Sequence, residues 1–258
     1  MIVTTAGRTN EKMESLAIKV ANYFKAEYVF RNKRSINAIK NKYNSDVLVI
    51  GKERFEWYST KNNSPFFFHP NSAIFRIKRL MNKENDPFIK ATGLTNGKSF
   101  LDCTLGIASD SMVASFAVGD KGKVIGLEAS PIISNLVDIG LKEWDTGNEE
   151  INQAMKRIVV KNKHALDELK ESKEASFDCV YLDPMFEEPI DSDGINPLKQ
   201  LALYGEWTEE MIYHAKRVAI DRVVLKDHFR SKRFEKYDFE QQRRKSAKFH
   251  YGIWYKNL

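Results

Sequence analysis

From residue 99 onwards, short apolar segments alternate with amphipathic ones, and this alternation limits the possible folds most strongly. The apolar segments are rich in Val, Ile, Leu and Phe and lie at 100–105, 123–128, 157–161, 177–183 and 222–226. Segments with helical periodicity separate them, at 109–119, 131–144, 164–172 and 208–219. Strands that alternate with helices of this length predict βαβ crossovers and a mostly parallel sheet that is covered on both faces. The apolar and aromatic segment 248–256 is predicted to add to the sheet edge as an antiparallel strand.

The part of the chain before residue 99 is predicted to form a smaller α/β unit. We expect strands at 2–5, 27–30 and 46–51, a paired set at 55–59 and 65–70, and helices at 11–24, 36–43 and 72–83. Ser35 suits the N-cap of the second helix. Gly93 and Gly97 mark a break near residue 95. We therefore predict an N-terminal domain at 1–95 that recognises substrate and a larger domain at 96–258.

Length and composition limit the class of protein. A chain of 258 residues that is 42% hydrophobic and 29% charged can bury a substantial core. No apolar run is long enough to cross a bilayer, and no signal peptide is visible. Cys103 and Cys179 lie in apolar segments and suit reduced core thiols, so we expect a cytoplasmic protein without a disulfide or a metal site. The oligomeric state stays open.

Charge is distributed unevenly along the chain. Residues 1–98 hold 18 Lys and Arg against 8 Asp and Glu, whereas residues 99–225 hold 13 against 23. Residues 226–258 are basic again, with 10 against 4. Basic flanks around an acidic centre indicate a polyanionic partner, although ordinary solvated surface charge would give the same pattern.

The segment that follows the strand at 100–105 has the properties of a ligand-binding turn. In an open α/β sheet, ligands bind beyond the carboxyl ends of the strands, where Asp102 and Thr104 fall. Gly106 lets the backbone approach a ligand closely, and Ala108 and Ser109 keep the start of the next helix open. The segment lacks the three glycines of a dinucleotide fingerprint, which disfavours a nicotinamide dehydrogenase. Asp110, at the helix start, favours a cationic or zwitterionic ligand.

Two further segments match an adenosyl ligand. Glu128 ends the next strand, 22 residues beyond Gly106, where a carboxylate can accept hydrogen bonds from a ribose diol. His164 follows the third strand, where an adenine edge would lie, although a lone histidine at a helix start also suits a cap or a surface position.

The most specific motif is Asp183-Pro184-Met185-Phe186, at the end of the fourth strand of the larger domain. Pro184 removes a donor and stiffens the turn, which leaves carbonyl groups free to face a ligand. Asp183 can accept a hydrogen bond from an exocyclic amine, and Phe186 can stack on the base that carries this amine.

Together these segments resemble a known family. The strings LDCTLGIASD, GLEASP, KNKHALDEL and VYLDPMF, in this order and spacing, are similar to class I S-adenosylmethionine-dependent methyltransferases. The resemblance covers most of residues 65–226 and is closest to the bacterial enzymes that modify a guanine N2 in 16S ribosomal RNA. It implies a Rossmann-like seven-stranded sheet, S-adenosyl-L-methionine as cofactor and small-subunit ribosomal RNA as partner.

The resemblance also assigns roles to residues. It implies that the target amine binds at Asp183, Pro184, Met185 and Phe186. The cofactor contacts that it implies by position are Ser109, Asp110, Glu128, Ala129, His164, Ala165 and Asp183. The strand-end and loop residues Asp102, Thr104 and Gly106 are expected to contact the cofactor as well. The basic residues expected to contact RNA are Arg76, Lys78, Arg79, Lys226, Arg230, Arg243 and Arg244.

Other interpretations remain open. The acidic run Glu187, Glu188, Asp191 and Asp193 directly follows the motif, where the family has basic residues. It favours a protein or small-molecule acceptor, because carboxylates repel phosphate. A non-catalytic RNA-binding protein that retains the fold is a third possibility, which the intact amine-site motif disfavours.

Overall fold

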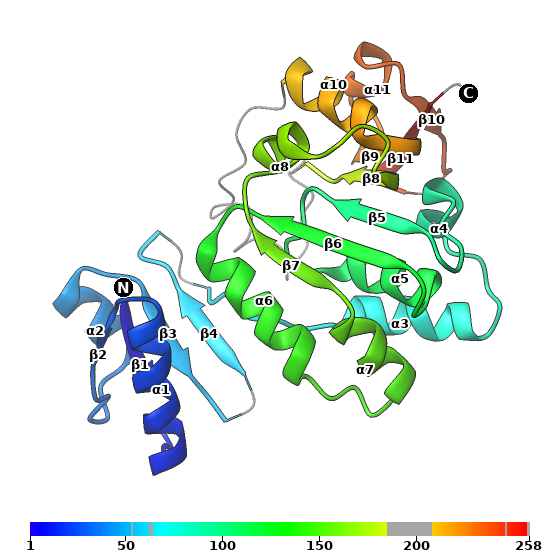
Figure 1. The fold of residues 1–258 in the computed structure, drawn as a ribbon. Helices are drawn as coiled ribbons and strands as arrows, with labels where there is room; N and C mark the ends of the chain where they lie inside the picture. The colour runs from blue at the N-terminus through cyan, green and yellow to red at the C-terminus, as the bar shows by residue number, and fades with distance from the viewer. Residues whose placement is uncertain (53, 62–63, 185–207, 246, 257–258) are drawn as a thin grey trace. The chain divides into compact units, whose positions relative to one another are not determined.

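The computed structural model describes residues 1–52, 54–61, 64–184, 208–245 and 247–256, and these form two compact units. One unit comprises residues 1–68 and the other comprises the described residues from 69 onwards (Figure 1). By its contacts the chain therefore divides between Phe68 and His69, whereas the sequence placed the domain boundary at residue 95. The intervening helices pack with the larger unit, and the roles predicted for the two domains stay predictions.

The first unit is built on a four-stranded sheet. Its order is β2 (Glu27–Tyr28), β1 (Ile2–Thr5), β3 (Val47–Ile50), β4 (Phe55–Tyr58). β1 is parallel to both β2 and β3, and β4 is antiparallel to β3. Helices α1 (Glu11–Tyr23) and α2 (Ile36–Tyr43) begin at caps in which the Asn10 and Ser35 side chains accept backbone N–H groups. The strand expected at 65–70 is reduced to an isolated bridge between Trp57 and Phe66.

The second unit contains the predicted seven-stranded sheet. From one edge to the other the strands are β10 (Glu240–Gln242), β11 (Phe249–Tyr255), β9 (Ala219–His228), β8 (Phe177–Leu182), β5 (Ser99–Asp102), β6 (Lys123–Glu128) and β7 (Val159–Asn162). The five strands from β9 to β7 are parallel, and β11 is antiparallel to β9. The expected antiparallel strand at 248–256 is confirmed, but β10 covers its outer side.

Helices cover both faces of this sheet (Figure 1). One face carries α8 (Ala165–Glu171) and α10 (Glu209–Val218), which close a core around Leu101, Val180 and Leu182. The helices associated with the other face are α3 (Asn71–Met81), α4 (Pro87–Thr92), α5 (Ser109–Val118), α6 (Pro131–Glu143) and α7 (Glu149–Lys156). A short helix, α11 (Arg233–Lys236), precedes β10.

An aromatic cluster joins α4 to the middle of the sheet. Phe88 of α4 contacts Phe100 of β5 and Tyr181 of β8 edge to face, with ring centroids 5.7 and 5.2 Å apart. All three rings are almost completely buried. Edge-to-face pairs of this kind contribute about 0.5–1.5 kcal/mol each beyond the burial of their area. The cluster therefore holds the chain before the sheet against the two strands that carry the candidate site.

Candidate functional site

Several polar side chains predicted from the sequence meet at the carboxyl ends of the central strands. Asp102 ends β5, Glu128 ends β6, and Asp183 directly follows β8. The strand register places Asp102 beside Tyr181 on one side and Gly126 on the other. Parallel strands bring their carboxyl ends to one edge of a sheet, which is why residues far apart in the sequence form one site.

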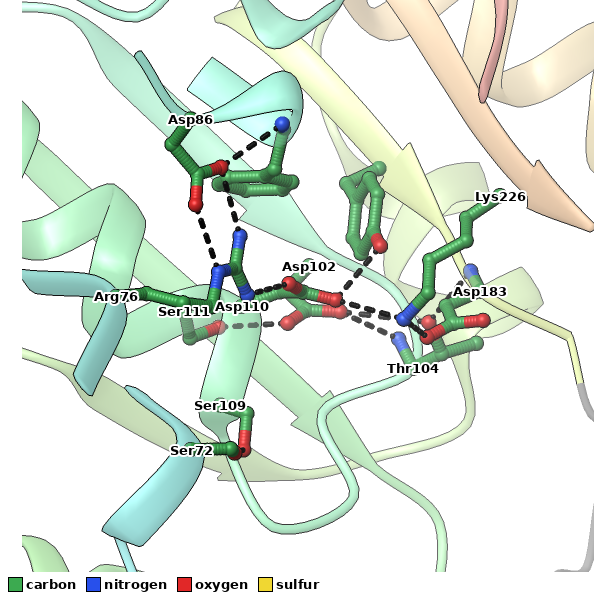
Figure 2. Close-up of polar contacts among 12 residues, drawn as sticks. Ser72, Arg76, Asp86, Asp102, Thr104, Ser109, Asp110, Ser111, Asp183 and Lys226 are labelled. Atoms are coloured by element: carbon green, nitrogen blue, oxygen red, sulfur yellow. Dashed lines mark hydrogen bonds and ion pairs between the residues drawn. The ribbon is translucent and has the colours of Figure 1, made fainter. Parts of the chain in front are cut away.

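Asp110, in the first turn of α5, is at the centre of the polar network (Figure 2). Its carboxylate accepts hydrogen bonds from Arg76 at 2.5 Å, from the Tyr181 hydroxyl at 2.7 Å and from Lys226 at 3.1 Å. Burial alone would raise the pKa of Asp110, but the charges of Lys226 and Arg76 hold this pKa well below its usual range. The carboxylate is therefore ionised whenever the protein is folded at neutral pH.

Arg76 links α3 to two other elements. Its guanidinium contacts both oxygens of Asp86 at 2.9 and 3.0 Å, in addition to Asp110. Asp86 also accepts the backbone N–H groups of Phe88 and Ile89, so it caps α4 while it pairs with the arginine. Burial opposes the charge of Arg76, but the two carboxylates raise its pKa above the usual value. The positive charge of Arg76 is thus balanced by two carboxylates of the protein. The prediction of an RNA contact did not anticipate this arrangement.

Lys226 of β9 bridges the network to the predicted amine site. Its ammonium lies 2.6 Å from an Asp183 oxygen and 3.1 Å from Asp110. Burial raises the pKa of Asp183 to about 6; the charge of Lys226 acts against this shift, and the Asp110 carboxylate adds to it. The Asp183 side chain keeps 25% of its surface exposed, so part of this carboxylate faces open space beside the cation.

Asp102 holds the turn next to this network through hydrogen bonds. One oxygen accepts the Ser111 hydroxyl at 2.6 Å, and the other accepts the backbone N–H of Thr104 at 3.0 Å. The Thr104 hydroxyl in turn accepts the backbone N–H of Asp183 at 2.8 Å. Burial raises the pKa of Asp102 to about 7, against these hydrogen bonds. Asp102 and Thr104 thus connect the turn after β5 to the turn after β8.

Glu128 is a buried carboxylate with one oxygen unpartnered in the described chain. It is 3% exposed, and its Oε1 accepts the backbone N–H of Ser130 at 2.9 Å. Its Oε2 is buried and has no hydrogen-bond partner among the residues that the structure describes. Burial raises the pKa of this carboxyl, and the amides of Ser130, Gly106 and Ala129 act in the opposite direction. An unsatisfied buried carboxylate oxygen costs about 1–3 kcal/mol or more, and a ligand hydroxyl would remove this cost.

The turn between β5 and α5 has an unusual backbone at two buried residues. Gly106 has a φ of +51°, and a Cβ built on it would meet only one atom within 4 Å, the Thr104 carbonyl oxygen at 4.0 Å. Ala108, the residue before α5, has a φ of +62°, which is unfavourable for a residue with a side chain. Backbone strain of this kind clusters at functional sites. At Gly106 the protein therefore leaves room next to the backbone of the turn.

The remaining predicted cofactor residues lie at the same edge or close to it. The Ser109 hydroxyl is 3.0 Å from that of Ser72 in α3 (Figure 2). Ala129 follows β6, and its carbonyl accepts a hydrogen bond from Asn162 at 3.2 Å. His164 directly precedes α8 without a side-chain cap hydrogen bond, and Ala165 begins that helix. Pro184 is described, whereas Met185, Phe186 and the acidic run at 187–193 lie outside the described residues.

The basic residues predicted to contact RNA differ in their surroundings: some are paired with carboxylates and others are exposed. Lys226 and Arg76 are bound to carboxylates, and Arg79 of α3 pairs with Glu84 at 2.8 Å. Lys78, Arg230 and Arg243 are exposed. Arg244 lies over the Phe249 ring at 5.2 Å, and Arg230 lies over Phe229 at 5.0 Å.

A cavity of about 210 Å³ lies beside the network within the second unit. Arg76, Asp110 and Lys226 of the network line this cavity, together with Arg244, Phe249 and Tyr251. Burial raises the pKa of the Tyr251 hydroxyl, as does the Asp110 carboxylate. Cations and aromatic rings therefore line a hollow that adjoins the lysine which holds Asp183.

Sequence reasoning missed three members of the network. Tyr181 donates to Asp110, Ser111 donates to Asp102, and Asp86 pairs with Arg76. Asp86 had a signal, because an aspartate before Pro87 is typical of a helix start. Tyr181 had a weaker one, since a buried tyrosine hydroxyl needs a partner. Nothing in the local sequence indicated that Ser111 would face Asp102.

The described part of the chain offers neither a cluster of metal ligands nor a membrane-spanning helix. No group of three or more His, Cys, Asp or Glu side chains there is placed to hold a metal ion. No helix within the same residues is long and apolar enough to span a membrane.

Comparison with known proteins adds to this geometry. Residues 33–253 match the family described as "Putative SAM-dependent methyltransferase". The uncharacterized protein YpiP of Bacillus subtilis (strain 168) is 46% identical over 253 residues, with 98% of each chain covered. The crystal structure of the S-adenosylmethionine-dependent methyltransferase NGO1261 from Neisseria gonorrhoeae superposes with a TM-score of 0.61 at 16% identity. That alignment covers 99% of this chain and 96% of NGO1261.

The seven-stranded sheet and its helices have the Rossmann-like fold of class I methyltransferases. The family match covers most of the chain, so the protein belongs to the S-adenosylmethionine-dependent methyltransferase family. Its cofactor is S-adenosyl-L-methionine. The unpartnered Glu128 oxygen and the open turn at Gly106 fit the ribose and the adjoining part of this cofactor.

Proposed function

We propose that the protein transfers a methyl group to an exocyclic amine of a nucleobase in RNA, the N2 amine of a guanine in small-subunit ribosomal RNA. The observation that carries this proposal is the Asp183 carboxylate at the carboxyl end of β8. It is partly exposed, it is held by Lys226 at 2.6 Å, and it begins the amine-site motif. A fixed carboxylate with a free face suits an acceptor for N–H groups.

In the proposed reaction, Asp183 orients a weak nucleophile. The lone pair of an exocyclic amine is delocalised into the base, so the amine must be held in line with the methyl group. S-adenosyl-L-methionine supplies an electrophilic methyl group when it binds. Asp183 accepts an N–H hydrogen bond from the amine and takes the proton that the nitrogen loses. Orientation of this kind is worth roughly 7–11 kcal/mol of the barrier.

The charge of Lys226 keeps Asp183 ready for this role. A carboxylate with a pKa of about 6 is mostly ionised at pH 7, and the adjacent ammonium favours that ionised form. The ion pair with Asp110 fixes the ammonium from the other side. Pro184, Met185 and Phe186 are proposed to complete the amine site, with Phe186 stacking on the base.

The proposed cofactor contacts follow the strand ends. Glu128 would accept the ribose hydroxyl groups through its unpartnered oxygen, and the turn at Gly106 would lie against the cofactor. Ser109, Ala129, His164 and Ala165 are proposed to surround the rest of it. Asp102 and Asp110 act on these elements through hydrogen bonds and ion pairs, because their oxygens are already bound to protein groups.

Basic residues support RNA as the acceptor. Lys78, Arg79, Arg230, Arg243 and Arg244 are proposed to contact its phosphates without reading the sequence. The cavity beside Lys226 combines Arg244 with Phe249 and Tyr251, and this mixture of cations and rings suits a nucleotide. The N-terminal unit is proposed to contribute to recognition of the same RNA.

A second candidate is methylation of a protein or small-molecule acceptor. The observation that favours it is the acidic run at Glu187, Glu188, Asp191 and Asp193, next to the amine site in the sequence. Carboxylates at that place would oppose the approach of phosphate groups.

The variant Asp183→Asn tests the proposed role of this carboxylate. An amide accepts N–H groups weakly and cannot take the proton, so we expect methyl transfer to ribosomal RNA to fall by roughly 100-fold or more. Binding of S-adenosylmethionine, measured by calorimetry, should persist. A variant that retains wild-type turnover would exclude Asp183 as the acceptor.

A further inference from the structure

The small sheet of the N-terminal unit has a switch point of its own. From β1 the chain passes through α1 to β2 on one side, and then through α2 to β3 on the other side. All three strands are parallel. In open α/β sheets, ligands bind at such a switch point, beyond the carboxyl ends of the strands. Here the switch point lies between β1 and β3. A cavity of about 210 Å³ lies there, lined by Ala6, Val49, Gly51, Lys52, Arg54 and Glu56.

Small residues keep this cavity open. Ala6 follows β1 and donates its backbone N–H to Ile50 at the end of β3, at 2.9 Å. Gly51 directly follows β3, and its N–H is bonded to the Arg54 carbonyl at 3.1 Å. A Cβ built on Gly51 would lie only 2.6 Å from that carbonyl oxygen. The turn therefore requires glycine, and it returns Arg54 to the edge where the cavity lies.

Cations collect in the three segments that follow the parallel strands. The segments at 6–10, 29–35 and 51–54 contain Arg8, Arg31, Lys33, Arg34, Lys52 and Arg54. The described acidic residues in or next to these segments are fewer, namely Glu11, Glu14 and Glu56, and Glu53 lies outside the described residues. Arg54 pairs with Glu56 at 2.7 Å, whereas Arg31 donates to the carbonyl groups of Thr5 and Arg34.

Contacts place two of these cations at the ends of the parallel strands. Arg31, from the segment after β2, donates to the Thr5 carbonyl at the end of β1 at 3.2 Å. Arg54, from the segment after β3, pairs with Glu56, whose other oxygen accepts the Tyr58 hydroxyl at 2.8 Å. Burial and Glu56 raise the pKa of Tyr58 to about 12, and Arg31 and Arg54 both act in the opposite direction. Lys52 forms no ion pair with a described carboxylate, so its charge is available to a ligand.

An exposed aromatic ring lies at the same edge. Phe30 follows β2, 54% of its surface is exposed, and its carbonyl accepts a hydrogen bond from Arg34 at 2.5 Å. An aromatic face next to guanidinium groups is a typical platform for a base of a single strand, and such stacking contributes about 1–3 kcal/mol per base. A membrane surface would need a larger apolar face than this single ring supplies.

We propose that this edge of the N-terminal unit is a second RNA-binding site, which takes a phosphate group in the cavity and a base against Phe30. The proposal rests on the proposed function in one respect, that the substrate of the protein is RNA. It assigns recognition to the carboxyl ends of β1, β2 and β3, apart from the amine site. Phosphate in the cavity would be held by Lys52 and by the guanidinium group of Arg54, both of which line it.

Two matched triple variants of the full chain test this site. The first, Arg8→Gln/Lys33→Gln/Lys52→Gln, removes three exposed charges from the edge. The control, Lys19→Gln/Lys25→Gln/Lys42→Gln, removes three exposed charges from the ends of α1 and α2 at the opposite edge. Lys33 and Lys25 both have a positive φ, so the two triples are also matched in backbone strain. Fluorescence anisotropy with a labelled 12-nucleotide single-stranded RNA measures the affinity.

The first triple should weaken RNA binding by at least tenfold. The slope of log affinity against log salt concentration should become less steep by about 2. The control triple should change the affinity by less than twofold. Equal losses in both triples, or no loss in the first, would overturn the proposal. Tighter binding of the wild type to phosphatidylglycerol vesicles than to RNA, abolished by the first triple, would overturn it in favour of a membrane.

The result separates this site from the proposed function. A wild-type protein that binds RNA through this edge but methylates none of it contradicts the proposed function alone. A first triple that methylates and binds RNA like the wild type contradicts the second site alone.

Discussion

Asp110 determines the electrostatics of the site because it binds two cations at once. Arg76 and Lys226 each contact one of its oxygens, and the Tyr181 hydroxyl adds a third hydrogen bond. Removing one partner from a buried ion pair costs about 3–5 kcal/mol, because the other charge stays buried. The network is thus a costly arrangement, and its chemical consequence is that Lys226 remains charged beside Asp183.

Replacing Lys226 should change the pH dependence of methyl transfer. The ammonium favours the ionised form of Asp183, so Lys226→Met should raise the pKa of this carboxyl above about 6. Activity requires the ionised form and falls as pH decreases through that pKa. The acidic limb of kcat/KM should therefore move to higher pH by roughly one to three units.

Lys226→Arg is the matched variant, because it keeps the charge and should leave the limb close to its wild-type position. Circular dichroism checks that both variants fold. If Lys226→Met lowers the rate equally at every pH, the lysine affects structure alone.

The unpartnered oxygen of Glu128 gives a second prediction at this scale. Glu128→Gln should weaken the binding of S-adenosylmethionine by roughly 10- to 100-fold, since hydrogen bonds to a charged group contribute about 1.5–3 kcal/mol. Glu143→Gln, at the exposed far end of α6, is the control and should bind like the wild type. Calorimetry measures both. Equal affinity of Glu128→Gln and the control would place the ribose elsewhere.

At the scale of the elements, the turn between β5 and α5 contains a glycine, Gly106, whose backbone conformation disfavours other residues. Gly106 and Gly97 both have positive φ values, +51° and +87°, and both have space for a Cβ. Alanine at either position should therefore lower the free energy of unfolding by a similar amount, about 1–2 kcal/mol. The two positions differ in their surroundings, because Gly106 is buried in the turn at the candidate site and Gly97 is exposed away from it.

Gly106→Ala should also weaken S-adenosylmethionine binding by roughly tenfold, because its methyl group would occupy the room next to the backbone of the turn. Gly97→Ala should retain wild-type affinity. Urea denaturation and calorimetry on the two variants separate strain from loss of the ligand contact. An unchanged affinity in Gly106→Ala would show that the cofactor does not contact this turn.

The sequence predicted the elements better than their contacts. Periodicity located the five parallel strands and the antiparallel strand at 248–256, because buried strands and amphipathic helices leave local patterns. The short helices α4 and α7 were missed although Asp86 and Asn148 cap them. Length alone does not explain this, because the similarly short α2 and α8 were predicted. The ion pairs of Arg76 could not be predicted, because Asp110 is 34 residues away and only the tertiary structure brings the two side chains together.

At the scale of the whole molecule, charge varies along the chain, and basic segments occur in both units. The acidic central segment contains the strand ends of the proposed cofactor site, and the basic segments lie before and after it. A polyanionic substrate would be attracted to the flanks rather than to the strand ends themselves. Family membership defines the cofactor, whereas the proposed acceptor rests on Asp183 and on these basic segments.

The most direct test is methyl transfer to ribosomal RNA from cells that lack this gene. Purified protein and radiolabelled S-adenosylmethionine are added, and the RNA is digested to nucleosides for analysis. We predict label in N2-methylguanosine from the small-subunit RNA, and none when Asp183→Asn replaces the wild type. Label confined to protein, or to a nucleoside methylated elsewhere than on an exocyclic amine, would contradict the proposed reaction.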